Sequence, residues 1–437
     1  MLIDATTLED LGIYTTNPEH TSVLQALDFT TTIGGQEQLQ VLLAQPLSSI
    51  EAIIQRQQAI QYIGEHLAQC NTGISNGTVV MMEQFYTTNL DGLPAQANIV
   101  SATQYKALHH TNYALAKYSV THFIQFYKGL SLILQQCMQD APTELAASLH
   151  RIKQVIQKHE ELQYIITTTH ELNLVHTVAI AYFFKMKLKQ ETIELIDIYS
   201  KLDAWWSMAK AKEKYKLSYP EFVMSNTALL QANELFHILL PTPVAYHIGL
   251  SKGSNFMFLT GANMAGKSTY IKAVGIAVYL AHIGMAVPAA SMQLSLYHGI
   301  LSNIHVVDNI SKGESYFYNE VKRIKHTVEK INDGQKWLVL IDELFKGTNV
   351  QDAMKCSSTV IKGLVKMKQA AFILSTHLYE IGEELTMFSN IQFKYFETHV
   401  THGQLTFSYI LKNGVSNDRL GYLILQNEGV VALLNDL

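Results

Sequence analysis

The sequence predicts a protein of the α + α/β class, in which a mostly helical N-terminal domain is followed by an α/β domain. No glycine occurs between Gly129 and Gly249, and only Pro142 and Pro220 interrupt residues 101–230, so long helices are permitted there. From about residue 240, short apolar strands alternate with helical segments, which indicates a parallel-rich sheet with helices on both faces. With 437 residues, 48% of them hydrophobic, the chain can bury more than one core. We therefore expect two domains, at residues 1–232 and 233–437.

Two stretches of the N-terminal part show apolar residues at helical spacing. In residues 50–70 the buried stripe is predicted to consist of Ile50, Ile53, Ile54, Ile60 and Ile63. In residues 191–216, which end in several lysines, it is predicted to consist of Ile193, Ile196, Ile198, Leu202, Trp205 and Trp206. By default these stripes are core positions of a scaffold.

The C-terminal part contains three apolar strand segments, "FMFLTG", "KWLVLIDE" and "AAFILSTH". Two further segments, "NIQFKYFETHV" and "QLTFSYILKNG", are typical of an antiparallel hairpin at a sheet edge. The longest apolar stretch, residues 273–290, is interrupted by His282, two glycines and Pro288, so we expect a buried helix and a loop rather than a membrane span.

Charge and composition narrow the class of protein. The N-terminus has no basic segment followed by an apolar run, and the three cysteines are far apart, so we expect a cytoplasmic protein without a disulfide framework or zinc site. The net charge is -5; residues 1–150 carry 4 Lys and Arg against 12 Asp and Glu, whereas residues 151–216 carry 11 against 8. Because DNA affinity depends on neutralising phosphates, any DNA contact is expected to be local or shared between subunits. The lysines of residues 151–216 are either a solvated helical face or a DNA track.

A glycine loop follows the "FMFLTG" strand. Residues 261–268, "GANMAGKS", match the pattern G-x-x-x-x-G-K-[ST], in which backbone amides surround a phosphate at the start of a helix. Lys267 is expected to reach the β- and γ-phosphates, and Ser268 to bind Mg²⁺. The residues expected to bind ATP are Gly261, Ala262, Asn263, Met264, Ala265, Gly266, Lys267, Ser268 and Thr269.

Two acidic residues, Asp342 and Glu343, end the "KWLVLIDE" strand. Asp342 is expected to hold Mg²⁺ through water, and Glu343 to orient or deprotonate the attacking water. The alternative is that the two carboxylates cap a helix. His377 ends the "AAFILSTH" strand and is expected to sense the γ-phosphate, unless it is only structural. The polar loop "FKGTNVQDA" between them suits a subunit contact.

With these motifs the sequence resembles the MutS family of DNA mismatch repair ATPases. "TGANMAGKSTY" is similar to the family's "TGPNMGGKSTY", with Ala262 and Ala265 as departures, and "IGMAVPA", "LVLIDELFKGTNVQDA" and "STHLYEI" follow in the family's order. Ser315 matches the serine of the family's "STF-x-x-E" loop, with Glu320 at the acidic position. The resemblance implies an ATPase domain of ATP-binding-cassette-like type. It also implies that Ser315 contacts the nucleotide of a partner, in a homodimer or with a related MutS-like subunit.

The resemblance extends to the N-terminal half. Residues 1–14, 24–63 and 198–215 look like the start and the return helices of the family's helical lever domain, although Gln36 replaces a common arginine. The chain begins where that lever begins, so we expect the mismatch-binding and connector domains to be absent. None of the 17 phenylalanines is followed two positions later by glutamate, so the family's Phe-x-Glu wedge has no counterpart. Residues 100–200 also look too few for a full DNA clamp.

These observations favour a MutS-like ATPase dimer, with a C-terminal dimerisation segment, that uses Mg²⁺ and couples ATP turnover to DNA association. DNA binding is expected to be weak or structure-specific, with a repair protein as a further partner and no membrane contact. One alternative is a nucleotide-controlled protein-interaction module without mismatch recognition. Another is a different ATP-binding-cassette-type chromosome-maintenance ATPase, which the absence of an L-S-G-G-Q sequence and of a long heptad coil disfavours.

Overall fold

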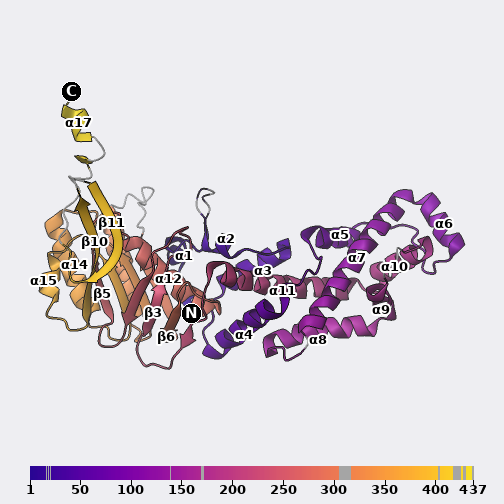
Figure 1. Ribbon diagram of the computed structural model, residues 1–437, viewed down its shortest axis with the longest axis horizontal. Helices are drawn as coiled ribbons and strands as arrows, with labels where there is room; N and C mark the ends of the chain where they lie inside the picture. Colours follow the sequence, from indigo (N-terminus) through magenta and orange to yellow (C-terminus); the bar gives the residue numbers. More distant parts are fainter. Residues whose placement is uncertain are drawn as a thin grey trace. The chain divides into compact units, whose positions relative to one another are not determined.

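The chain forms two compact units in the computed structural model (Figure 1). The structure describes residues 1–437 except 16, 18, 20, 138, 169–171, 305–315, 402–403, 417–424, 427–429 and 436–437. The helical unit consists of Leu27–Gln45 and Ile54–Glu213, and the α/β unit of Met1–Ala26, Pro46–Ile53 and Lys214–Leu437. As expected, the protein combines a helical part with an α/β part.

The helical unit is made of long helices connected by short loops. In chain order they are α3 (Ile33–Ala44), α4 (Ile50–Leu67), α5 (Asn76–Thr87), α6 (Ile99–Leu108), α7 (His110–Cys137), α8 (Thr143–Lys158), α9 (Glu160–Thr167), α10 (Leu174–Met186) and α11 (Lys189–Tyr215). The first residues of α4 and the last two of α11 belong to the α/β unit.

The predicted apolar stripes are confirmed in part. In α4, Ile53, Ile60 and Ile63 are fully buried, but Ile54 is 42% exposed. In α11, Trp205 is fully buried whereas Ile193 is 42% exposed. The core of this unit is aromatic: the rings of Phe123 and Phe184 stack with centroids 4.2 Å apart. Of the eleven residues predicted for the two stripes, seven are buried and only Ile54 and Ile193 are exposed.

A buried carboxylate joins α11 to the start of α3. Asp203 is 1% exposed and accepts hydrogen bonds from the backbone amides of Thr31 (3.1 and 3.0 Å) and Thr32 (3.0 Å). The hydroxyls of both threonines donate to it as well, at 3.1 and 2.8 Å. Thr32 is the N-cap of α3, so Asp203 holds the helix start in place and brings a negative charge to its N-terminus.

The α/β unit is organised around a seven-stranded sheet with the strand order β1-β7-β8-β9-β5-β10-β11. Its strands are β1 (Leu2–Ile3), β5 (Phe256–Thr260), β7 (Gly299–Asn303), β8 (Trp337–Asp342), β9 (Ala371–Ser375), β10 (Ile391–Thr401) and β11 (Gln404–Asn413). All neighbouring pairs are parallel except β10 and β11, which form the antiparallel edge hairpin that the sequence predicts. The carboxyl ends of β5, β8 and β9 therefore lie along one edge of the sheet.

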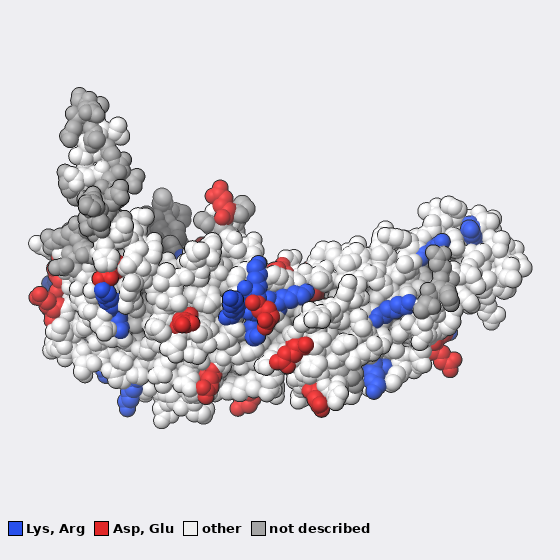
Figure 2. All heavy atoms as spheres, viewed as in Figure 1, with Lys and Arg blue, Asp and Glu red and all other residues white. Residues whose placement is uncertain are grey.

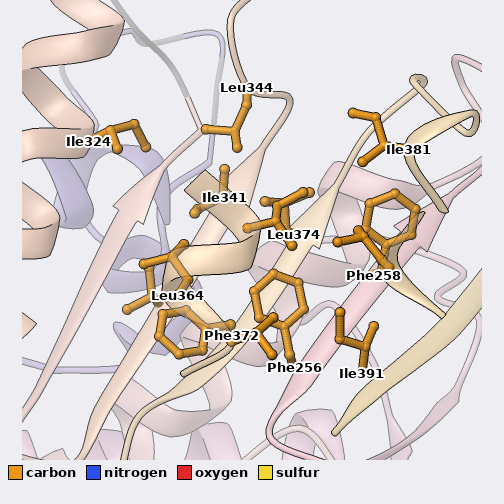
Figure 3. Close-up of a cluster of buried hydrophobic side chains, with 14 of the residues drawn as sticks. Phe256, Phe258, Ile324, Ile341, Leu344, Leu364, Phe372, Leu374, Ile381 and Ile391 are labelled. Atoms are coloured by element: carbon orange, nitrogen blue, oxygen red, sulfur yellow. The ribbon is translucent and has the colours of Figure 1, made fainter. Parts of the chain in front are cut away.

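Helices cover both faces of this sheet. On one face, α13 (Tyr316–Ile331), α14 (Val350–Leu364) and α15 (Ile381–Leu385) enclose the cluster of buried side chains in Figure 3, which includes Phe258, Ile341 and Leu374. On the other face, Gly275 of α12 (Lys267–Ile283) packs against Leu340 of β8. Strand residues 340 and 341 thus point to opposite faces, and both are buried, as expected for a parallel sheet between two helical layers.

Smaller elements complete the α/β unit. The second sheet has the order β2-β6-β3-β4. Its strands are β2 (Glu221–Phe222), β3 (Leu230–Leu235), β4 (Tyr246–Leu250) and β6 (Ser291–Leu294), and the remaining helices are α1 (Ala5–Asp10), α2 (Val23–Leu27) and α17 (Val430–Asn435). Helix α12 ends at Gly284 and is followed by a loop, as the sequence predicts for residues 273–290. Among the described residues, no helix is both long enough and apolar enough to cross a membrane.

The N-terminal segment packs in the α/β unit, which differs from the boundary that we expected at residue 232. Strand β1 pairs with β7, and α1 follows it directly. The Asp10 carboxylate accepts hydrogen bonds from the hydroxyl of Ser302 and from the amide of Ile304 (3.1 Å). Asp4 pairs with Arg323 of α13 at 3.1 Å. Pairing between residues nearly 300 positions apart therefore decides where this segment lies.

Candidate nucleotide-binding site

The glycine loop connects the fully buried strand β5 to α12 at the carboxyl edge of the sheet. Gly266 is the N-cap of α12 and has a φ of 106°, a conformation that glycine adopts without strain. A Cβ at this position would lie 3.3 Å from the ring of Tyr409, so a side chain would also crowd the loop. Because the first backbone amides of a helix lack partners within it, they attract anions. The loop therefore has the backbone geometry of a phosphate site.

Lys267 lies inside this loop. Its Nζ donates hydrogen bonds to the carbonyl oxygens of Gly261 (2.8 Å) and Ala262 (3.0 Å), and the side chain is buried. Burial lowers the pKa of the Lys267 ammonium, while the carboxylates of Glu343 and Asp342 oppose that shift. The lysine is thus a cation enclosed by backbone oxygens and close to two carboxylates, where a phosphate group would find an additional positive partner.

Asp342 ends β8 beside the first turn of α12. The Ser268 hydroxyl donates a hydrogen bond to one oxygen of its carboxylate, and the Ser375 hydroxyl donates to the other. Ser375 is the register partner of Asp342 on β9, so the sheet itself brings the two side chains together. The sequence did not identify Ser375 as a site residue, although its place directly before Thr376 and His377 at a strand end was a usable signal.

The oxygen atoms of Ser268 and Asp342 fit a magnesium ion. Mg²⁺ prefers oxygen ligands, keeps several waters, and is usually held by one or two carboxylates together with substrate phosphates. Among the described residues there is no group of three or more His, Cys, Asp or Glu side chains that could hold a metal ion. An ion bound here would therefore take most of its ligands from water and a nucleotide.

Glu343 follows Asp342 with a positive φ of 61°, which turns its side chain out of the strand direction. Its Oε2 lies 3.2 Å from Nζ of Lys346, and its Oε1 lies 3.7 Å from Nδ1 of His377, an electrostatic contact longer than a hydrogen bond. The His377 ring and then the Lys346 ammonium lower the pKa of Glu343 to about 2, against the opposing effect of burial. The structure thus brings the acidic residue and the strand-end histidine together, and adds Lys346.

Lys267, Ser268 and Glu343 border one pocket of about 450 Å³, a volume within the usual range for small-molecule sites. Seven of its lining residues were predicted from the sequence to be site residues: Asn263, Met264, Gly266, Lys267, Ser268, Thr269 and Glu343. The other lining residues, which the prediction did not include among the binding residues, are Leu240, Thr242, Val244, Tyr246 and Tyr409. Ala262 and Ala265 are buried, and Ser315 lies outside the described residues.

Tyr409 reaches the pocket from β11, far away in the sequence. It has a φ of 55°, and the pairing of β10 with β11 shifts register between Phe396 and Thr398. Irregularities of this kind re-aim side chains at the ends of sheets. No local sequence pattern marks this position. The segment before β4 supplies Leu240, Thr242 and Val244. Its place in the chain, shortly before the strand that carries the glycine loop, was a signal that could have marked it as part of the pocket.

The fold and the site together define a protein in which a helical unit accompanies an α/β unit with a glycine loop at the carboxyl edge of a parallel sheet. Comparison with known proteins gives the family. The models for MutS domain III and MutS domain V match residues 6–209 and 257–431, which together are most of the chain. The chain belongs to the MutS family.

Several relatives match a little over half of the chain. The human "MutS protein homolog 4" is 30% identical over 256 residues, which are 54% of this chain and 27% of that protein. The "DNA mismatch repair protein MutS" of Petrotoga mobilis is 27% identical over 233 residues, 53% of this chain and 28% of that protein. The "DNA mismatch repair protein MSH3" of Candida glabrata is 32% identical over 241 residues, 52% of this chain and 23% of that protein. The chain thus matches about a quarter of the length of these relatives.

Proposed function

We propose that the protein binds ATP with Mg²⁺ in the pocket at the carboxyl edge of the sheet and hydrolyses it. The observation that carries this proposal is the convergence of Lys267 and Ser268, from α12, with Glu343, which follows β8, around one pocket of suitable size, where Ser268 also donates a hydrogen bond to Asp342. Phosphoryl transfer needs little covalent chemistry from a protein; it needs positioned charges around the transferred phosphoryl group. A cation, a metal-binding carboxylate and a second carboxylate for water are the parts required.

Each residue has a distinct role in this proposal. The loop amides and Lys267 hold the β- and γ-phosphates, and Ser268 with Asp342 hold Mg²⁺, which when bound neutralises charge on the phosphates. Glu343 accepts a hydrogen bond from the attacking water and takes its proton. His377, beside Glu343, contacts the γ-phosphate. The low pKa of Glu343 means that it is ionised, and thus able to act as an acceptor, at neutral pH.

The aromatic and apolar side of the pocket suits the adenine base. Tyr409 and Tyr246 line it together with Val244, and aromatic rings are common partners of flat bases. The lining thus combines groups suited to phosphates with aromatic and apolar side chains suited to a base, which are the two chemical parts of a nucleotide. His247, the neighbour of Tyr246, is not a lining residue, and its Nδ1 lies 3.2 Å from Oδ1 of Asn233.

The proposal extends to a dimer of ATP-binding-cassette-like type. Strand β9 lies between the glycine-loop strand β5 and the carboxylate strand β8, and it delivers His377 between them. In such a dimer Ser315 contacts the partner's nucleotide, and the partner is a second copy or a related MutS-like subunit. The C-terminal segment contributes to dimerisation. The names of the relatives, two of which are DNA mismatch repair proteins, support a coupling of ATP turnover to DNA association.

The surface of the helical unit supports weak rather than strong DNA binding. On the face shown in Figure 2, basic and acidic side chains are interspersed and most of the surface is uncharged. Several lysines have structural contacts: Lys185 donates to the carbonyls of Phe85, Tyr86 and Thr88 at 2.6–3.2 Å and so caps the end of α5. Because acidic side chains lie among the basic ones on this face, the affinity should be low and sensitive to salt.

Two titrations test this function. ATP and ADP are titrated against the purified chain with and without Mg²⁺, and release of phosphate is followed. Mismatched, branched and perfect duplexes are then titrated at low salt with ATP, with ADP and without nucleotide. The absence of nucleotide binding would contradict the ATPase proposal. Absence of affinity for every DNA in every nucleotide state would contradict the DNA part alone.

A second candidate is a nucleotide-controlled protein-interaction module. The observation that favours it is the apolar surface of α6 in the helical unit, where Ile99, Val100 and Leu108 are 76%, 66% and 78% exposed. Exposed apolar groups of this kind mark protein contacts more often than DNA contacts. Recovery of one protein partner in a nuclease-treated pull-down, lost when Ile99 and Leu108 are changed to Ser, would favour this candidate. DNA crosslinking through Lys187 would count against it.

A further inference from the structure

The N-terminal part of α13 is joined to the loop that follows β8. The carboxylate of Glu320 accepts hydrogen bonds from the backbone amides of Lys346 (3.0 Å) and Gly347 (3.1 Å). The Glu320 side chain is only 4% exposed. Amide donors have therefore taken the place of water around a buried negative charge, an arrangement in which charge-assisted hydrogen bonds are strong and geometrically specific.

The backbone of this loop also packs closely on α13. A Cβ at Gly347 would lie 2.7 Å from the backbone nitrogen of Phe317 and 2.8 Å from the ring of Tyr316, so the close approach requires glycine. The ring of Phe317 lies 5.6 Å from that of Phe345, measured between centroids. Hydrogen bonds and side-chain packing thus hold the same loop against the same helical turn.

Lys346 connects this anchored loop to the carboxylate proposed to act on water. Its backbone amide is held by Glu320, and its Nζ lies 3.2 Å from Oε2 of Glu343. Residues 343 and 345 both have a φ of 61°, so the chain turns sharply between the end of β8 and the amides that Glu320 holds. The position of the Lys346 ammonium, and with it the orientation of Glu343, therefore depends on where α13 holds the loop.

We propose that Glu320 is a positioning residue for ATP hydrolysis: by holding the amides of Lys346 and Gly347, it fixes the Lys346 ammonium beside the Glu343 carboxylate. This inference rests on the proposed function, because Glu343 has a role only if ATP is hydrolysed. In the sequence, α13 begins one residue after Ser315. The helix that carries Glu320 therefore directly follows, in the chain, the residue proposed to contact the partner's nucleotide.

The test compares Glu320→Ala, Glu320→Gln, Lys346→Met and the double variant Glu320→Ala/Lys346→Met. We expect kcat per nucleotide site to fall roughly 10- to 100-fold in Glu320→Ala, because small displacements of a reacting group have effects of this size. The affinity for ATP should change by less than about twofold, which separates positioning from binding. Glu320→Gln should recover part of the loss, since its amide oxygen can accept one hydrogen bond. The double variant should be no slower than the slower single variant, because the two residues act through one contact.

The matched control is Glu329→Ala, which removes an exposed carboxylate from the same helix and should leave kcat unchanged. Counting sites by bound nucleotide corrects for any unfolded fraction, so a merely structural role would leave kcat per site at the wild-type value. That result, or a double variant whose loss equals the product of the single losses, would overturn the positioning role while the proposed function stands. If the wild-type chain binds or hydrolyses no ATP, the proposed function itself fails, and the positioning role fails with it.

Discussion

The hydroxyl of Ser268 donates a hydrogen bond to the carboxylate of Asp342, which joins the first turn of α12 to the end of β8. These two residues are 74 positions apart, and two β-strands and a helix separate them in the chain. A hydroxyl and a carboxylate in contact form a ready pair of oxygen ligands. The contact places the pair proposed to bind Mg²⁺ beside the pocket that the glycine loop borders, which Ser268 lines.

Replacement of Lys267 should abolish productive nucleotide binding. Lys267→Ala removes the cation enclosed by the loop, and we expect at least roughly 100-fold weaker ATP binding, about 3 kcal/mol. Calorimetric titration with ATP and Mg²⁺ measures this. Lys252→Ala, in an exposed turn of the same unit, is the control and should bind as the wild type does. Equal affinity in the Lys267 variant would remove this lysine from the site.

Replacement of Glu343 should separate binding from hydrolysis. Glu343→Ala keeps the loop, Lys267 and Asp342, so ATP should bind and remain uncleaved, with turnover lower by roughly 100- to 10,000-fold. Single-turnover assays with labelled ATP show whether ATP or ADP is bound. Glu383→Ala, an exposed carboxylate of α15, controls for loss of charge. Hydrolysis by Glu343→Ala at the wild-type rate would exclude this carboxylate from the proposed role.

Ser315→Ala tests the dimeric part of the proposal. If this serine contacts the partner's nucleotide, turnover should fall by roughly tenfold or more, while the ATP affinity of the monomer stays the same. Turnover is measured over a range of protein concentrations, and ATP binding is measured at low concentration, where the monomer prevails. The comparison separates a loss of turnover in the dimer from a loss of ATP affinity in the monomer. A mixture with the Lys267→Ala chain should recover part of the activity if each chain completes the other's site. Unchanged turnover in Ser315→Ala would contradict a contact in trans.

In the helical unit, Asp203 should be a large contributor to stability. Asp203→Ala leaves the amides and hydroxyls of Thr31 and of the buried Thr32 without this acceptor, which we expect to cost about 3 kcal/mol of unfolding free energy. Urea unfolding followed by tryptophan fluorescence reports on it, because two of the three tryptophans, Trp205 and Trp206, lie in this unit. Asp197→Ala, exposed on the same helix, should change little. An equal loss in both variants would argue against a specific anchor.

The fully buried His282 should make the α/β unit sensitive to acid. Burial lowers the pKa of His282 to about 4 from its ordinary value of 6.5, and the ring bonds as a neutral group, with Nδ1 donating to Val278 and Nε2 accepting from Tyr297. The unfolded ring therefore takes up a proton at higher pH than the folded ring. Its stabilisation is complete above about pH 6.5 and is lost as the pH falls towards about 4.

Between about pH 7 and about pH 5 this loss should amount to about 2 kcal/mol. Calorimetric melting of His282→Gln should show a correspondingly weaker dependence on pH than the wild type, whatever its stability at pH 7. His326→Gln, exposed on α13, should melt with the wild-type dependence. Parallel curves for His282→Gln and the wild type would show that another group governs the acid sensitivity.

Much of the fold could be predicted from the sequence because it depends on patterns among residues that are close together in the chain. Strand β5, the glycines and Lys267 are adjacent in the chain, and Asp342 directly ends the apolar strand β8. The sequence could therefore predict that the glycine loop and the two acidic residues lie at strand ends. The edge hairpin followed from two alternating segments close in sequence. Six of the nine predicted loop residues, and Glu343, border the same pocket, whereas Gly261, Ala262 and Ala265 do not line it.

The rest depends on contacts between distant parts of the chain. Tyr409 enters the pocket from β11, and Ser375 meets Asp342 through sheet register; neither relation has a local pattern. Ile54 and Ile193 fit helical spacing but are exposed, because packing partners and not periodicity alone decide which face is buried. The two-residue strand β1 is too short for any periodic signal, and only its pairing with β7 reveals it.

That pairing sets an order of events during synthesis. A ribosome makes Leu2 long before Gly299, its partner in the sheet, and at typical rates the interval is roughly 15–60 seconds. The helical unit lies between them in the chain, so it can fold while the first strand still waits for its neighbour. The N-terminal residues can therefore take their place in the sheet only after the whole helical unit has been made, and a shortened chain that starts after the helical unit would leave the β7 edge of that sheet uncovered.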